Sequence, residues 1–158
     1  MFDLVNGLPI HPLVVHAVVV LLPLAVLGTI AIAVRPAWRT RYGVLVVACA
    51  AVATALVPVA TSSGEALEKH VGDPGKHAAL GDQLIWFAIP LLVLATALVW
   101  LANRAERGRA TPGPRWLPTA VAVLAAVAAL ASAVQVYRIG DSGARAAWGD
   151  QVASTQRR

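Results

Sequence analysis

Long uncharged stretches alternate with short charged ones along the chain. The uncharged stretches contain no Asp, Glu, Lys or Arg, and they cover residues 13–34, 42–60, 84–102 and 117–137. Each is close to the ~20 residues that a helix needs to cross ~30 Å of hydrocarbon. Strands of a membrane β-barrel would be about 10 residues long with alternating polarity, whereas these stretches are apolar throughout. The pattern therefore predicts an all-α fold: a transmembrane four-helix bundle that forms a single membrane domain over residues 1–158.

The segments that follow the second and fourth spans are expected to be helical as well. Residues 61–83 are predicted to form a helical hairpin outside the membrane, and Gly72 is expected to end its first helix. Asp73 and Pro74 then favour the start of the next helix, as an N-cap residue followed by a proline at the first helical position. Residues 140–148 are predicted to form a short helix at the membrane interface.

Basic residues indicate the side of the membrane on which each connection lies. The connections after the first and third spans are rich in arginine, namely Arg35, Arg39, Arg41, Arg104, Arg107, Arg109 and Arg115. The first twelve residues have no basic side chain, and residues 61–83 carry two lysines against four acidic residues. Since positively charged connections stay in the cytoplasm, both termini are predicted to be extracytoplasmic.

Composition narrows the classes of function. Only 13% of the residues are charged and 58% are hydrophobic, against about 25% charged residues in a soluble domain, so a large soluble catalytic domain is excluded. The net charge of +5 would suggest a nucleic-acid partner for a soluble protein. Here the arginines flank the spans and indicate topology, so we expect no nucleic-acid binding. Cys49 is the only cysteine, which excludes an intrachain disulfide and a c-type haem attachment motif.

The spans also lack the groups that ion-coupled transport requires. Proton pumps and ion-coupled transporters usually keep an ionisable residue inside the membrane, and none of the four spans contains Asp, Glu, Lys or Arg. These classes are therefore disfavoured, and histidine becomes the residue type on which the candidate chemistry depends.

All four histidines fall at the predicted outer end of the bundle: His11, His16, His70 and His77. His16 lies one turn inside the first span, where a polar side chain without a partner is costly. Two interpretations remain open for it. One is a hydrogen bond to a neighbouring helix backbone or to Gln135, and the other is ligation of haem iron or another metal by a neutral imidazole nitrogen. His77, in the first turn of the third helix, is the natural second ligand if the apolar part of that helix begins near Ala78.

The remaining polar groups at this end are weaker candidates. His11 precedes Pro12 and is interpreted first as a residue at the helix start and second as a further ligand, while His70 is interpreted as a solvated side chain. Arg138 is a candidate partner for haem propionates, or else an ordinary interfacial anchor. Other polar residues predicted at the same end are Thr61, Ser62, Asp82, Gln83, Ser132, Gln135 and Tyr137.

Four short segments carry a resemblance to a known family: Leu8–His16, Thr61–Ala66, His77–Gly81 and Tyr137–Gly140. With its His-Pro-x-x-x-His start, the chain resembles the bacterial family called domain of unknown function 2231 over nearly its whole length. Members are predicted four-helix proteins of the bacterial cytoplasmic (inner) membrane, and some are fused to Rieske iron–sulfur or cytochrome c domains. The resemblance implies a redox setting and a b-type haem, with His11, His16 and His77 at the matching motif positions. A histidine often occupies the place of Asp141 in that family, so this tail position is not a candidate ligand here.

The leading hypothesis is a membrane protein that binds haem b between the first and third helices and relays electrons near the outer face of the membrane. Its iron ligands would be His16 and His77, with His11, Gln135 and Arg138 as further cofactor-binding residues. Nothing in the sequence identifies a substrate, so no enzyme activity is expected. The expected partners are the lipid bilayer, a Rieske or cytochrome c type redox protein, and a second copy of the chain. The alternatives are a cofactor-free accessory or assembly protein of a larger membrane complex, and a carrier of a small solute or metal.

Overall fold

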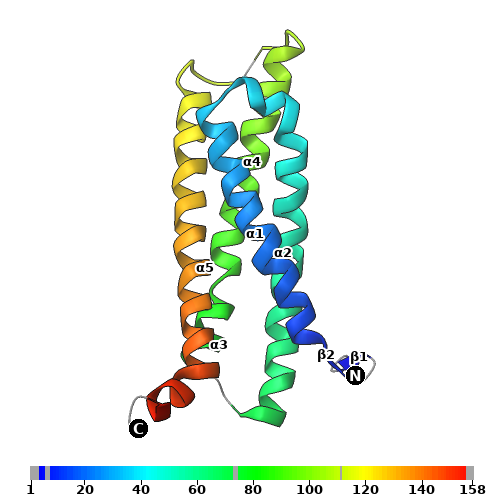
Figure 1. Ribbon diagram of the computed structural model, residues 1–158. Coiled ribbons are helices and arrows are strands. Elements are labelled where there is room, and N and C mark those ends of the chain that lie inside the picture. Colours follow the sequence, from blue (N-terminus) through cyan, green and yellow to red (C-terminus); the bar gives the residue numbers. More distant parts are fainter. Residues whose placement is uncertain (1–3, 6–7, 73–74, 111, 156–158) are drawn as a thin grey trace.

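The computed structural model describes residues 4–5, 8–72, 75–110 and 112–155. Two short strands, β1 (Leu4–Val5) and β2 (Leu8–Pro9), pair antiparallel just before the first helix. The helices of the described residues are α1 (Ile10–Val34), α2 (Ala37–Val71), α3 (Lys76–Asp82), α4 (Ile85–Glu106) and α5 (Leu117–Thr155). They form the four long rods seen in Figure 1, because α3 and α4 together make the third rod.

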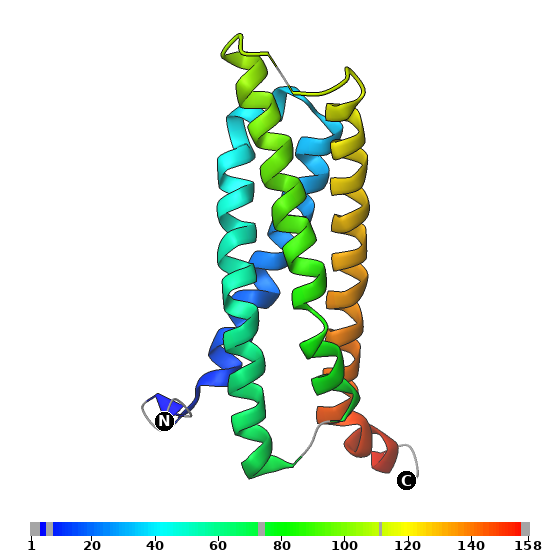
Figure 2. The ribbon, with the colours of Figure 1, turned by 180° about the vertical axis from the view of Figure 1, so that it is seen from behind.

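The four rods form a closed ring in which successive rods run in opposite directions. Helix α1 packs against α2 and α5, and α4 packs against the same two helices. Figure 2 shows this arrangement from behind, with α4 between α2 and α5. As a result α1 and α3 begin at the same end of the bundle at which α2 and α5 finish. We call this the histidine end, because His11, His70 and His77 lie there, and we call the opposite end the arginine end.

Each rod is long and apolar enough to cross a membrane. The apolar helical stretches are Ile10–Val34, Ala37–His70, Lys76–Glu106 and Leu117–Gly149, and an 18-residue segment of each has a mean hydropathy between 2.2 and 2.8. Large apolar side chains face outward along all four rods, among them Leu27, Leu45, Val93 and Leu130. Such a surface is unfavourable in water and well matched to lipid. The predicted all-α bundle of four membrane-spanning helices is confirmed.

Small side chains recur at the contacts between the rods. Fully buried alanines come from every rod: Ala25, Ala50, Ala53, Ala88, Ala95, Ala125 and Ala129. Small residues let backbones approach closely, which is how helices associate in lipid. The approach is tightest at two glycines. A Cβ atom would lie 2.7 Å from Val46 Cγ2 if added to Gly28, and 2.5 Å from Val99 Cγ2 if added to Gly43.

The helices extend beyond the predicted spans at the histidine end. Helix α2 continues to Val71 and ends at Gly72, whose φ of 92° is favourable for glycine and whose N–H donates to the Glu68 carbonyl at 2.8 Å. The predicted stop at Gly72 is therefore confirmed. The predicted start at Asp73 and Pro74 lies outside the described residues, and α3 begins at Lys76.

Two features differ from the predicted elements. The third rod is interrupted at residues 83–84, between α3 and α4. Residues 140–148 are helical as expected, but they belong to α5 rather than to a separate helix. Glycines in this segment do not end the helix, because a helical glycine costs only ~1 kcal/mol and is compatible with helical dihedral angles. Figure 1 shows the last turns of α5, in red, bending away from the bundle axis.

At the arginine end, Arg39 closes the C-terminus of α1. Its Nε donates to the Ile32 carbonyl at 2.9 Å and its Nη2 to the Ala33 carbonyl at 3.0 Å. These carbonyls belong to the last turn of a helix, where no further backbone N–H is in position to satisfy them. Other arginines at this end lie over aromatic rings, in the pairs Arg35 with Trp38, Arg41 with Tyr42, and Arg104 with Trp100.

Candidate functional site

A cavity of about 530 Å³ opens between the rods at the histidine end. Its volume falls within the ~300–1,000 Å³ that is usual for small-molecule sites. The wall is mainly apolar and comes from α1, α2, α3, α5 and the interruption between α3 and α4, with Val15, Val18, Val57, Leu67, Leu84 and Val136 among its side chains. The charged residues that line it are Glu65, Glu68 and Asp82, and the other polar side chains of the lining are Thr61, His11 and His77.

His11 enters the cavity from the start of α1, where it is the second residue of the helix. Its Nδ1 lies 2.9 Å from the carbonyl oxygen of Ala60, in α2, and 3.3 Å from the hydroxyl of Ser63. The Ser63 hydroxyl in turn donates to the same Ala60 carbonyl at 3.0 Å. The ring packs on Gly64, where an added Cβ would lie 3.1 Å from His11 Cε1.

His77 enters the cavity from the start of α3, where it is again the second residue of its helix. Its Nδ1 lies 3.1 Å from the carbonyl oxygen of Ile139, in α5, and 3.4 Å from the hydroxyl of Ser142. The Ser142 hydroxyl donates to the Ile139 carbonyl at 2.9 Å. This ring packs on Gly143, where an added Cβ would lie 3.0 Å from His77 Cε1.

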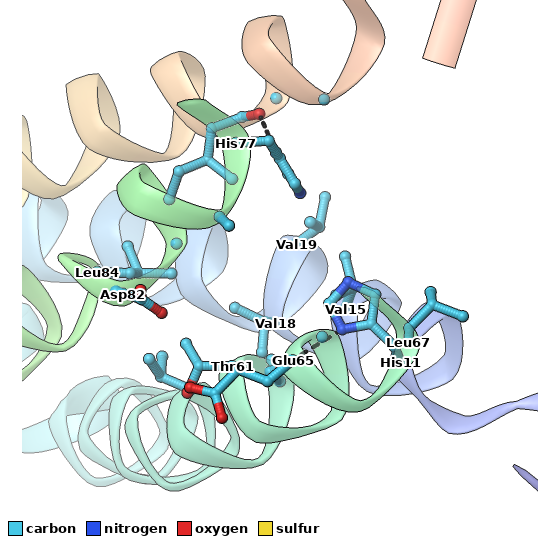
Figure 3. A pocket seen from close by; sticks show the side chains of 18 of the residues that line it. His11, Val15, Val18, Val19, Thr61, Glu65, Leu67, His77, Asp82 and Leu84 are labelled. Atoms are coloured by element: carbon cyan, nitrogen blue, oxygen red, sulfur yellow. Dashed lines mark hydrogen bonds between the residues drawn. The ribbon is translucent and has the colours of Figure 1, made fainter. Parts of the chain in front are cut away.

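These contacts define the tautomer of both rings. A carbonyl oxygen can only accept a hydrogen bond, so Nδ1 of each histidine must carry the proton. The lone pair of each neutral ring is then on Nε2. In Figure 3 the ring of His77 points from α3 toward α1, and His11 lies on the opposite side of the cavity with its unbonded ring edge turned toward His77. The cavity thus presents two nitrogen donors that are held by backbone contacts from other helices.

The other two histidines lie outside the cavity lining and bond only within their own helices. His16 is exposed, and its Nδ1 bonds to the carbonyl of Pro12. His70 is also exposed, and its Nδ1 lies 3.1 Å from the Ala66 carbonyl. His16 follows His11 by five residues, which is about 140° around an α-helix, so the two side chains cannot face the same cavity. The cavity lining therefore includes His11 and His77, whereas His16, the predicted partner of His77, lies outside it.

Gln135 and Arg138 do not line the cavity either. Gln135 is buried, 1% exposed, and its Nε2 donates to the Leu80 carbonyl in α3 at 2.9 Å. This carbonyl is available because the rod is interrupted at residues 83–84 and the N–H of Leu84 donates to Gly81 instead. The exposed Arg138 donates to the Gln135 side-chain oxygen at 3.4 Å. Gln135 thus fastens α5 to the segment that carries His77 and contributes to the site indirectly, whereas Arg138 bonds to a residue of its own helix.

Several residues of the site were not among the sequence candidates. The two Ser-Gly pairs, Ser63-Gly64 and Ser142-Gly143, support the histidine rings, and Glu65 and Glu68 line the cavity. The occurrence of Ser-Gly near the end of both the second and the fourth span was the sequence signal that could have identified the supporting pairs.

The fold and the cavity define a multi-pass membrane protein with a histidine-lined site at one end of a four-helix bundle. The family model described as "Predicted membrane protein (DUF2231)" matches residues 7–156. The chain therefore belongs to this family, in agreement with the resemblance of its sequence motifs. Comparison with curated proteins and with solved structures gives no match.

Proposed function

We propose that this protein binds a b-type haem in the cavity at the histidine end, where His11 and His77 would hold the iron, and that it relays electrons between redox partners. One observation carries the proposal: two histidine rings, each fixed through Nδ1–H to a carbonyl of another helix, present their Nε2 atoms from opposite sides of a mainly apolar cavity. Histidines that ligate metals are commonly oriented by such a hydrogen bond from the other ring nitrogen.

The number of donors favours haem over a bare metal ion. Two histidines suffice for haem iron, because the porphyrin supplies the other ligands. Structural and catalytic zinc sites use at least three protein ligands. Among the residues that the structure describes, no group of three or more His, Cys, Asp or Glu side chains could hold a metal ion. The mainly apolar wall is the kind of surface that a porphyrin ring would pack against, and it would also keep water from the iron ligands.

The roles of the chain are orientation and environment, whereas the electron chemistry would be that of the haem iron. Ser63 and Ser142 hold the ligand rings, and the valines and leucines of the wall provide a low-dielectric slot. In this proposal the protein lies in the bacterial cytoplasmic membrane with both termini on the extracytoplasmic side. The concentration of arginine at the opposite end supports this orientation. The redox partner is then an extracytoplasmic or membrane-bound protein such as a Rieske or cytochrome c domain.

The test is an absorbance spectrum of protein purified in detergent from cells supplied with haem, before and after dithionite. We expect a Soret band and, on reduction, sharp split bands in the visible region. His11→Ala and His77→Ala should each lose this spectrum. His16→Ala and His70→Ala are matched controls, since both side chains lie outside the cavity lining, and both variants should retain it.

Two outcomes would overturn the proposal. If His16→Ala lost the haem and His11→Ala retained it, His16 rather than His11 would be the iron ligand. This result would contradict the ligand assignment based on the cavity. A featureless absorbance spectrum, together with a metal analysis that finds no metal, would exclude haem binding and favour a cofactor-free accessory protein of a larger membrane complex.

A further inference from the structure

The surroundings of His11 and His77 are the same, contact by contact. In each case the histidine is the second residue of its helix, and its Nδ1 bonds to a backbone carbonyl of another helix. The same Nδ1 also contacts the hydroxyl of a serine three residues after that carbonyl. The histidine ring packs on the glycine that follows the serine. In each case the serine hydroxyl donates to the same carbonyl. Two unrelated helix pairs would have no reason to share this set of contacts.

The burial pattern repeats in the same register. His77 follows His11 by 66 residues, and the same shift relates buried positions of α1 to buried positions of the third rod. These pairs are Val18 with Leu84, Leu22 with Ala88, and Ile32 with Leu98. Gly143 follows Gly64 by 79 residues, and this shift relates buried positions of α2 to those of α5. These pairs are Val46 with Ala125, Ala50 with Ala129, and Ala53 with Ser132.

We infer that the chain is a tandem repeat of two helical hairpins, α1–α2 and α3/α4–α5, and that each hairpin contributes one equivalent half-site to the cavity. In each half-site the serine, Ser63 or Ser142, is a positioning residue that holds the histidine as the Nδ1–H tautomer. What the two Nε2 atoms bind rests on the proposed function, whereas the half-sites themselves do not.

In each half-site the histidine Nδ1, the carbonyl oxygen and the serine hydroxyl form a triangle of hydrogen-bonding groups, and its chemistry explains how the serine acts. The serine hydroxyl donates its proton to the carbonyl, so its oxygen is turned toward the imidazole as a second acceptor for Nδ1–H. A tautomer with the proton on Nε2 would direct the Nδ1 lone pair at the carbonyl oxygen, and the serine could donate to that lone pair only by withdrawing its proton from the carbonyl. In surroundings of low dielectric such an unmet polar contact is costly. The glycine one residue later is needed because a side chain there would push the ring away from the triangle.

The experiment uses the full-length protein without haem, labelled with ¹⁵N in histidine, in detergent micelles. NMR of the imidazole nitrogens distinguishes the two neutral tautomers directly. We expect His11 and His77 to be held as the Nδ1–H form. Ser63→Ala should shift the tautomer ratio of His11 by about fivefold, in line with the loss of one hydrogen bond, and leave His77 unchanged. Ser142→Ala should do the reverse, with a shift of similar size.

Controls separate positioning from packing. Ser62→Ala removes a neighbouring hydroxyl that bonds only to the Pro58 and Val59 carbonyls of its own helix, so both histidine signals should stay as in the wild type. Ser63→Thr and Ser142→Thr keep the hydroxyl and should restore the wild-type tautomer.

The inference is overturned if the Ser→Ala variants leave the tautomers unchanged, if only one half-site responds, or if the threonine variants behave like the alanine variants. Because the NMR measurement needs no haem, its result is independent of the absorbance test. A protein with the expected tautomers and no haem spectrum would refute the proposed function and leave the duplicated half-sites intact.

Discussion

Replacing Gln135 by methionine should loosen the segment that carries His77. The Gln135 side chain is buried, and its amide donates to the Leu80 carbonyl across the contact between α5 and α3 at 2.9 Å. The interruption of the rod at residues 83–84 leaves that carbonyl without a helical partner, since the Leu84 N–H donates to Gly81. Methionine keeps much of the volume of glutamine and removes the donor, so the substitution tests the hydrogen bond rather than the packing.

The magnitude follows from two opposing effects. A buried carbonyl without a partner costs about 1–3 kcal/mol, but interhelical hydrogen bonds in membrane proteins average only about 0.6 kcal/mol and reach at most about 1.7 kcal/mol. We therefore expect the free energy of unfolding to fall by about 1 kcal/mol, which is about a fivefold change in the unfolding equilibrium constant. The loss should be larger than for most surface substitutions, which stay within about 0.5 kcal/mol.

The assay is reversible unfolding in mixed micelles with increasing sodium dodecyl sulfate, followed by circular dichroism. Arg138→Met is the matched control, because Arg138 is exposed, lies one turn away on the same helix, and contacts Gln135 only at 3.4 Å. In the histidine NMR experiment Gln135→Met should broaden the His77 signals and spare those of His11. Equal stabilities of Gln135→Met and wild type, with unaltered His77 signals, would refute the role assigned to Gln135.

Three further predictions concern the rest of the bundle. Gly43→Ala should lower the free energy of unfolding by about 1 kcal/mol. The added Cβ would lie 2.5 Å from Val99 Cγ2, and such overpacking costs about 1–3 kcal/mol, whereas the gain in helix propensity offsets only about 1 kcal/mol. A stabilised variant would contradict this prediction. Arg39→Met should cost about 1–2 kcal/mol in the same unfolding assay, since the Ile32 and Ala33 carbonyls lose their donors; an unchanged stability would show that water replaces the guanidinium. A reporter enzyme fused to the C-terminus should be active only on the extracytoplasmic side, and cytoplasmic activity would invert the orientation that the arginines indicate.

The fold was predictable from the sequence because crossing a membrane imposes a length and a polarity that can be counted. The four uncharged stretches correspond to the four rods, and the stop of α2 at Gly72 follows from the backbone freedom of glycine. Hydropathy marks the part of a helix that lies in hydrocarbon, however, and not the turns that extend beyond it. This is why α2 and α5 are longer than the predicted spans, and why the interruption at residues 83–84 was not anticipated.

The site was predictable only in part. Clustering of the histidines at one end follows from the number and direction of the spans, but the side of a helix that faces the bundle does not. Helix α1 is apolar all round, so its sequence has no polar face from which its rotation could be inferred. His16 was therefore preferred for its depth in the span, whereas the structure turns it outward and brings His11 into the cavity. The proposed internal repeat is not evident in the sequence, because it lies in buried positions and in two Ser-Gly pairs rather than in extended sequence identity.

The charge of the cavity wall restricts how an anionic cofactor can be held. The charged lining residues apart from histidine are Glu65, Glu68 and Asp82, so haem propionates would be repelled from the wall and should extend toward water at the histidine end. Glu68 is the half-buried member of this group. Glu68→Gln should therefore tighten haem binding by about two- to fivefold, which is the effect of removing a repulsion of about 0.5–1 kcal/mol. The affinity can be measured by competition for haem with a haem-binding apoprotein. Glu106→Gln, at the arginine end, should leave the affinity unchanged. Weaker binding in Glu68→Gln would mean that the carboxylate supports the site, and the propionates would then have to avoid it by a different orientation of the ring.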